Sequence, residues 1–296
     1  MWAAMDIGTN SCRLLIANPT RSGKLNTVVK LLRTTRIGQG LCPQENFLRQ
    51  EAMDRTLEAL REYDSVIRKY PVAEIQLIAT QAVREAENGN SLVGVIKERF
   101  GWELQIVSGR REAWLSYLGA SGGLTEADNP LIVDIGGGST ELIVMDRANR
   151  LKAVSIPLGA LKLYEKPLAD KELKRLFADK IKDFPQDPGI RIVGVGGTCT
   201  SIAAILLALK VYDAQKVQGF TMSADDIRNV YRKLINLQPL ERLTIAGVYP
   251  GREDIITEGI RILLTILAIF RKKDILVSDQ DLLQGLMYEK MTDLPS

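Results

Sequence analysis

The most informative absence in this sequence is histidine, of which its 296 residues contain none. Catalysis by Ser-His-Asp or Cys-His groups, zinc bound by histidine and phosphohistidine chemistry are therefore excluded. Any acid–base step must be carried out by Asp, Glu, Lys, Tyr or Cys side chains.

Cysteine is also scarce. The three cysteines, Cys12, Cys42 and Cys199, are odd in number and widely spaced. This usage is typical of a reducing compartment and argues against a disulfide framework or a zinc site. None of the three is a strong candidate for a nucleophile.

Long apolar runs and a basic leader are missing as well. The longest apolar stretch, residues 262–270, is interrupted by Thr265 and is far shorter than a membrane span. The chain does not start with a basic region followed by an apolar run, so we expect a cytoplasmic protein with no membrane partner. A net charge of +3 is too weak to indicate nucleic-acid binding, but it is compatible with a local anion site.

What the sequence does contain is a glycine-rich turn between two apolar runs, at residues 131–144. This pattern predicts a β-hairpin in which Gly136, Gly137, Gly138 and Ser139 leave room for successive N–H groups to converge on an anion. Asp134 and Glu141 flank the turn. Carboxylates beside a phosphate make sense mainly with a hard cation such as Mg²⁺, or Mn²⁺, between them. The alternative is a tight hairpin with two solvated acids.

The same hairpin occurs near the start of the chain. Gly8, Thr9, Asn10 and Ser11 follow Asp6-Ile7, and the two copies share Asp, Ile, Gly and Ser at equivalent positions. Two anion hairpins suggest an internal duplication, with two similar lobes facing a shared cleft. We place Asp6 with the metal residues and expect domains at residues 1–124 and 125–280, divided by a flexible connection over residues 119–130.

A third glycine turn lies between a strand and an apolar helix. Gly196, Gly197 and Thr198 would put N–H groups at the helix N-terminus, a favourable anion site, or would simply form a close-packed turn. Arg84, on a short predicted helix, is either a solvated charge or a phosphate clamp. Strands and helices alternate along the whole chain, so the fold class is α/β.

Together these motifs resemble the Ppx/GppA family of exopolyphosphatases and guanosine pentaphosphate phosphohydrolases, in a short two-domain form. The resemblance runs nearly end to end. It is carried by residues 6–16 (DIGTNSCRLLI), 79–84 (ATQAVR), 108–113 (SGRREA), 134–142 (DIGGGSTEL), 157–160 (PLGA), 194–198 (GVGGT), 249–254 (YPGRED) and 277–286 (VSDQDLLQGL).

The resemblance implies the two-lobed actin-like fold of sugar kinases and heat-shock chaperone ATPases, with duplicated ribonuclease H-like domains. It also implies that a last helix, at about residues 281–296, returns to the first lobe. The implied activity is Mg²⁺-dependent hydrolysis of a terminal phosphoanhydride in inorganic polyphosphate. By the same resemblance Glu112 is the base, Arg84 grips phosphate, and Asp134 and Glu141 organise the metal.

Two departures from the family pattern stand out. Arg111 replaces an acid that the family commonly has directly before the equivalent of Glu112, and no histidine occurs in residues 217–221. We expect Arg110 and Arg111 to favour the ionised form of Glu112, which lies in the first turn of its helix.

Three alternatives stay open. One is a guanosine pentaphosphatase of the stringent response, and another is a non-catalytic sensor of polyphosphate or an alarmone. The third, an ATP-dependent kinase of the same fold, has no evident acceptor-sugar motif. A homodimer is one assembly that the sequence leaves open.

Overall fold

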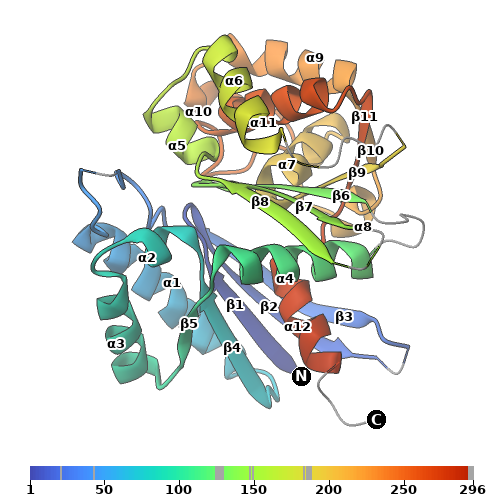
Figure 1. Ribbon diagram of the computed structural model, residues 1–296. Helices are drawn as coiled ribbons and strands as arrows, with labels where there is room; N and C mark the ends of the chain where they lie inside the picture. Colours follow the sequence, from blue (N-terminus) through green and yellow to red (C-terminus); the bar gives the residue numbers. More distant parts are fainter. Residues whose placement is uncertain are drawn as a thin grey trace. The chain divides into compact units, whose positions relative to one another are not determined.

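The computed structural model describes residues 1–20, 22–42, 44–123, 130–146, 148, 150–182, 184 and 189–292. The chain divides into two units: Met1–Gly122 with the C-terminal segment from Leu282, and Gly123–Asp281 (Figure 1). The expected boundary between residues 124 and 125 lies outside the described residues, as do residues 293–296 of the expected last helix.

The first unit is built on a mixed five-stranded sheet of order β3-β2-β1-β4-β5. The first three strands pair antiparallel, and β4 and β5 extend the sheet in parallel. Its strands are β1 Trp2–Ile7, β2 Ser11–Pro19, β3 Leu25–Thr34, β4 Glu74–Ala79 and β5 Leu104–Ile106, and its helices are α1 Gln50–Ile67, α2 Gln81–Glu85, α3 Gly89–Phe100, α4 Gly109–Gly122 and α12 Leu282–Thr292.

Strand β1 is buried on both faces, which explains its almost continuous apolar sequence. Met5 and Ile7 pack on one face with Leu60 of α1. On the other face Ala4 belongs to a cluster that includes Leu115 of α4. Figure 1 shows α4 and α12 covering this second face.

Helices α4 and α12 approach closely through Gly285. A Cβ atom at Gly285 would overlap the carbonyl group of Leu115. We therefore predict that Gly285→Ala destabilises the protein by about 1–3 kcal/mol, the usual cost of overpacking, measured by denaturant unfolding. In α3, Gly94 faces open space, so Gly94→Ala should instead stabilise by about 0.5–1 kcal/mol. Equal effects of the two substitutions would contradict the close packing.

The second unit has a six-stranded sheet of order β10-β11-β9-β6-β7-β8. Its strands are β6 Leu131–Ile135, β7 Thr140–Met145, β8 Leu151–Ile156, β9 Ile192–Val195, β10 Thr221–Ser223 and β11 Asp274–Val277. Its helices are α5 Ala160–Glu165, α6 Asp170–Ile181, α7 Gly196–Leu206, α8 Ala214–Val217, α9 Ala224–Ile235, α10 Pro239–Arg242 and α11 Ile256–Ile269.

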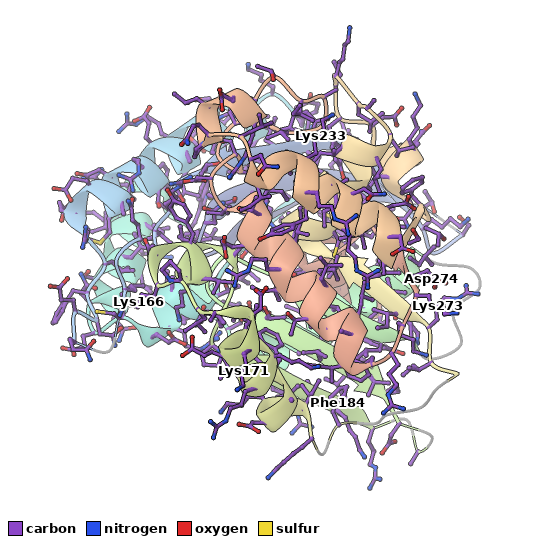
Figure 2. All side chains as sticks on the ribbon, turned by 90° about the horizontal axis from the view of Figure 1, so that it is seen from above. Lys166, Lys171, Phe184, Lys233, Lys273 and Asp274 are labelled. Carbon is purple, nitrogen blue, oxygen red and sulfur yellow. The ribbon has the colours of Figure 1, made fainter. Side chains whose placement is uncertain are left out.

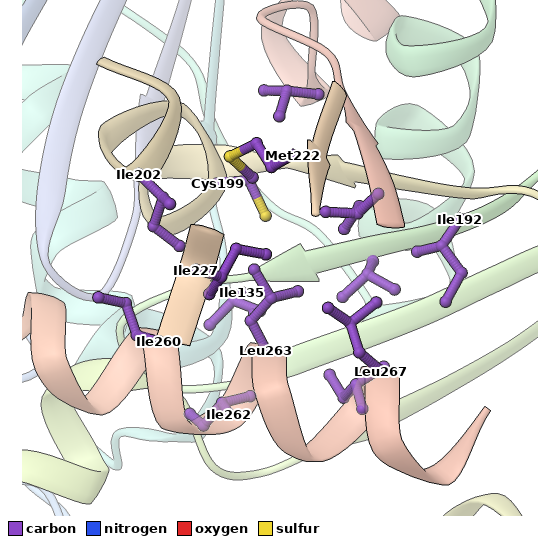
Figure 3. Close-up of a cluster of buried hydrophobic side chains, with 14 of the residues drawn as sticks. Ile135, Ile192, Cys199, Ile202, Met222, Ile227, Ile260, Ile262, Leu263 and Leu267 are labelled. Carbon is purple, nitrogen blue, oxygen red and sulfur yellow. The ribbon is translucent and has the colours of Figure 1, made fainter. Parts of the chain in front are cut away.

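The core of the second unit lies between this sheet and its helices. Ile135 of β6, Cys199 of α7 and Leu263 of α11 belong to one buried cluster, part of which Figure 3 shows. Lys171 on α6 and Lys233 on α9 are exposed on the outside of this unit (Figure 2). Alternate residues Leu131, Val133 and Ile135 face the cluster, so Asp134 lies on the opposite face of the sheet.

The two units repeat one arrangement. In each, an antiparallel three-stranded meander is extended by parallel strands, with β1-β2-β3-β4-β5 corresponding to β6-β7-β8-β9-β11. This confirms the α/β class. The repeated sequence motif occupies the same hairpin, β1–β2 or β6–β7, in each unit.

One expectation about the chain was wrong. A flexible connection was expected from Gly119, but α4 continues to Gly122. Gly119 is buried, and a Cβ atom at Gly122 would lie 2.6 Å from Cε2 of Tyr288 in α12. Small residues therefore serve close helix packing here. None of the helices in the described ranges has the length and apolarity needed to cross a membrane.

Candidate functional site

The first glycine turn, in the first unit, is closed by a hydrogen bond from Gly8 N to Ser11 O of 3.0 Å. Thr9 and Asn10 are only 6% and 5% exposed, and their N–H groups donate to no partner in the described part of the chain. Buried amides are almost always paired, so two adjacent unpaired ones form a nest suited to an anion.

The second unit repeats this turn. Gly136 N donates to Ser139 O, also at 3.0 Å, and the amides of Gly137 and Gly138 have no partner among the described residues. In this second turn the carbonyl oxygen of Gly136 accepts a hydrogen bond from Ala160 N, at the start of α5, at 2.9 Å. Gly159 permits this contact: a Cβ atom there would lie 2.5 Å from Gly136 O.

Asp134 and Glu141 lie directly opposite each other on β6 and β7. Glu141 is buried and accepts a hydrogen bond from Ser155 Oγ at 2.7 Å. Two like charges facing each other across strands are destabilising, so this pair fits a divalent cation. Among the described residues no three His, Cys, Asp or Glu side chains form a complete cage.

In the first unit the equivalent opposed pair is Asp6 and Arg13. Arg13 donates to Asp6 Oδ2 from Nε at 3.0 Å and from Nη2 at 2.6 Å. A metal role for Asp6 stays a prediction, but here the guanidinium already balances the carboxylate. Sequence reasoning missed Arg13, although it stands at the position of the first turn that matches Glu141 in the second.

Glu112 and Arg84 meet within the first unit. Arg84 Nη1 donates to Glu112 Oε2 at 3.0 Å and to Val107 O at 2.8 Å. Glu112 is 9% exposed and lies in the first turn of α4. Arg111 forms a two-point ion pair with Glu289 of α12, and the effect of Arg110 and Arg111 on the ionisation of Glu112 stays a prediction. Arg84, 28 residues earlier in sequence, supplies the positive charge beside Glu112.

The third glycine turn begins α7, in the second unit. Gly196 has a φ of +75°, and a Cβ atom there would lie 2.6 Å from Asp134 Oδ1. A Cβ atom at Gly197 would overlap the guanidinium of Arg252. The helix start therefore brings backbone N–H groups, a carboxylate and an arginine together. Sequence reasoning gave Arg252 no role, although it stands in the YPGRED motif at residues 249–254.

The two buried cysteines, Cys12 and Cys199, are poor nucleophiles. Burial raises the pKa of Cys12 and of Cys199, and the nearby carboxylates of Asp6 and Asp134 raise them further. Such thiols stay protonated at neutral pH and are unreactive.

The two α/β units, whose first hairpins carry matching glycine turns, have the duplicated arrangement of the actin-like fold class. The chain belongs to the Ppx/GppA phosphatase family, whose sequence model matches residues 16–294. It is 30% identical, over 97% of its length, to a bifunctional 3-dehydroquinate synthase/phosphatase of Fusobacterium nucleatum, but it spans only 46% of that protein.

Two further relatives match over almost their whole length. Exopolyphosphatase 2 of Mycobacterium tuberculosis is 29% identical over 96% of both chains. A crystal structure of the Aquifex aeolicus member of the Ppx/GppA family superposes with a TM-score of 0.81 at 28% identity, covering 99% of this chain and 98% of the other.

Proposed function

We propose that this protein is an exopolyphosphatase, which releases the terminal phosphate of inorganic polyphosphate by attack of water. The observation that carries the proposal is the repeated turn with two adjacent unpaired N–H groups in each unit. A substrate made only of linked phosphates offers nothing but anionic oxygens, and backbone N–H groups bind these well. The Mycobacterium tuberculosis relative, named an exopolyphosphatase, supports the choice of substrate.

Glu112 is the residue we assign to the attacking water. Its carboxylate accepts a proton from water as the oxygen attacks the terminal phosphorus, and the bond from that phosphorus to the bridging oxygen breaks. The products are orthophosphate and a chain one phosphate shorter. Arg84 holds the carboxylate in place through its 3.0 Å hydrogen bond.

Asp134 and Glu141 are the residues that would hold Mg²⁺ or Mn²⁺, because they are opposed carboxylates next to the second turn. A bound divalent cation would supply charge neutralisation for the phosphate oxygens. The turns of residues 8–11 and 136–139, with Gly196, Gly197 and Thr198, would hold phosphates through N–H groups.

Phosphate release from polyphosphate and from guanosine pentaphosphate, measured side by side, tests the proposal. We expect faster release from polyphosphate. Release from guanosine pentaphosphate alone would favour the nucleotide phosphohydrolase, and tight binding of either compound without release would favour a sensor.

Arg84→Lys is expected to lower kcat/KM by roughly 10–10²-fold, because lysine keeps the charge but lacks the rigid guanidinium that places Nη1 between Val107 O and Glu112 Oε2. Steady-state phosphate release measures the effect. Arg33→Lys is the matched control, since Arg33 pairs with Glu62 at an exposed position and should leave turnover unchanged. If the two variants behave alike, Arg84 is not part of the catalytic group.

A further inference from the structure

Arg36 is held in a left-handed backbone conformation next to the first glycine turn. Its φ is +49°, in a region that costs energy for residues with a side chain. The described residues contain two others of this kind, Ala208 and Arg271. Each of these follows the end of a helix, α7 or α11, where a left-handed residue is a common cap. Arg36 follows strand β3, so no helix end explains its conformation.

The first turn itself fixes this conformation. The amides of Thr35 and Arg36 both donate to Asn10 O, at 3.1 and 2.9 Å, and Gly38 N donates to Thr9 O at 3.0 Å. Residues 35–38 are therefore hydrogen-bonded to the carbonyl groups of Thr9 and Asn10. The N–H groups of these same two residues form the anion nest.

Glycine would adopt this conformation without strain. The chain does place glycine at other left-handed positions, including Gly40 in the same loop. An arginine kept at a strained position beside a binding site indicates that its side chain is needed there.

A second observation points to a ligand at the same junction. Thr35 Oγ is buried and has no hydrogen-bond partner among the described residues. Thr35 is 2% exposed, and its backbone N–H donates to Asn10 O. Unsatisfied buried polar atoms are rare, and a phosphate oxygen can accept a hydrogen bond from a hydroxyl.

We propose that Arg36 is a substrate-binding residue, whose guanidinium contacts a phosphate of the polyphosphate chain next to the nest of Thr9 and Asn10. The planar group can bind two phosphate oxygens at once. The inference rests on the proposed function, because it requires a polyphosphate substrate.

The test compares Arg36→Gly with Arg271→Gly, a control of the same residue type in the same backbone region. Both variants should unfold at a higher temperature, because glycine relieves the left-handed strain. Of these two variants, only Arg36→Gly should bind tripolyphosphate more weakly. Its Kd, measured by calorimetry, should rise tenfold or more, and the KM for polyphosphate should rise to match. Arg36→Lys keeps the backbone strain and should also bind more weakly, which covers the case in which Arg36→Gly fails to fold.

The outcomes separate this inference from the proposed function. Unchanged tripolyphosphate binding in Arg36→Gly and Arg36→Lys, with normal phosphate release by the parent protein, would overturn the role of Arg36 alone. Weaker binding in the Arg36 variants, with no phosphate release by the parent, would support Arg36 and overturn the hydrolase. A parent protein that binds no tripolyphosphate would overturn both.

Discussion

Replacing Glu112 with glutamine is expected to lower turnover by roughly 10²–10⁴-fold, the usual contribution of a general base. Glutamine keeps the size of the side chain and can still accept a hydrogen bond from Arg84 Nη1, so the local structure should persist. It cannot accept a proton from water. Substrate binding should therefore be largely kept, and the loss should fall on kcat in steady-state phosphate release.

The competing explanation is that Glu112 only complements the dipole of α4. Glu51 provides the control, because it also lies in the first turn of a helix, α1, and is exposed. Glu51→Gln should change stability by about 0.3–1 kcal/mol at most and leave turnover intact. If Glu112→Gln retains near-parental turnover as well, the base must be another residue.

The sequence was sufficient for the fold class because its strongest signals are local. Buried parallel strands read as short apolar runs, and the repeated Asp-Ile-Gly turn marks the same hairpin in both units. Short elements with weak periodicity were not foreseen, such as β10 and α10, because three or four residues carry too little pattern. The helical end of α4 was missed because Gly119 and Gly122 resemble loop residues until their packing partners are known.

Prediction of the site residues was limited by contacts between residues that are distant in sequence. The glycine turns and their acids could be named from spacing, since the residues that form each turn are adjacent in sequence. Pairings between distant residues could not. Nothing local indicates that Arg84 contacts Glu112, that Arg111 turns to Glu289, or that Arg252 covers Gly197. These contacts depend on how separate strands and helices meet.

Asp134→Asn is the second substitution with a large expected effect. The opposed carboxylates of Asp134 and Glu141 should bind Mg²⁺, so the parent protein should gain thermal stability on adding Mg²⁺ and lose activity in excess chelator. In Asp134→Asn one charge is removed, and the stability gain from Mg²⁺ should shrink. Turnover should fall by roughly 10²–10³-fold, because several kcal/mol of charge stabilisation are lost.

The dependence on Mg²⁺ separates a metal site from a merely structural acid. Loss of a metal ligand reduces the stability gained on adding Mg²⁺, whereas loss of a structural acid lowers stability equally with or without Mg²⁺. Asp225→Asn, on the exposed first turn of α9, should leave the response to Mg²⁺ unchanged. Full activity of the parent in chelator, or an unaltered Mg²⁺ response in Asp134→Asn, would rule out a metal role for this pair.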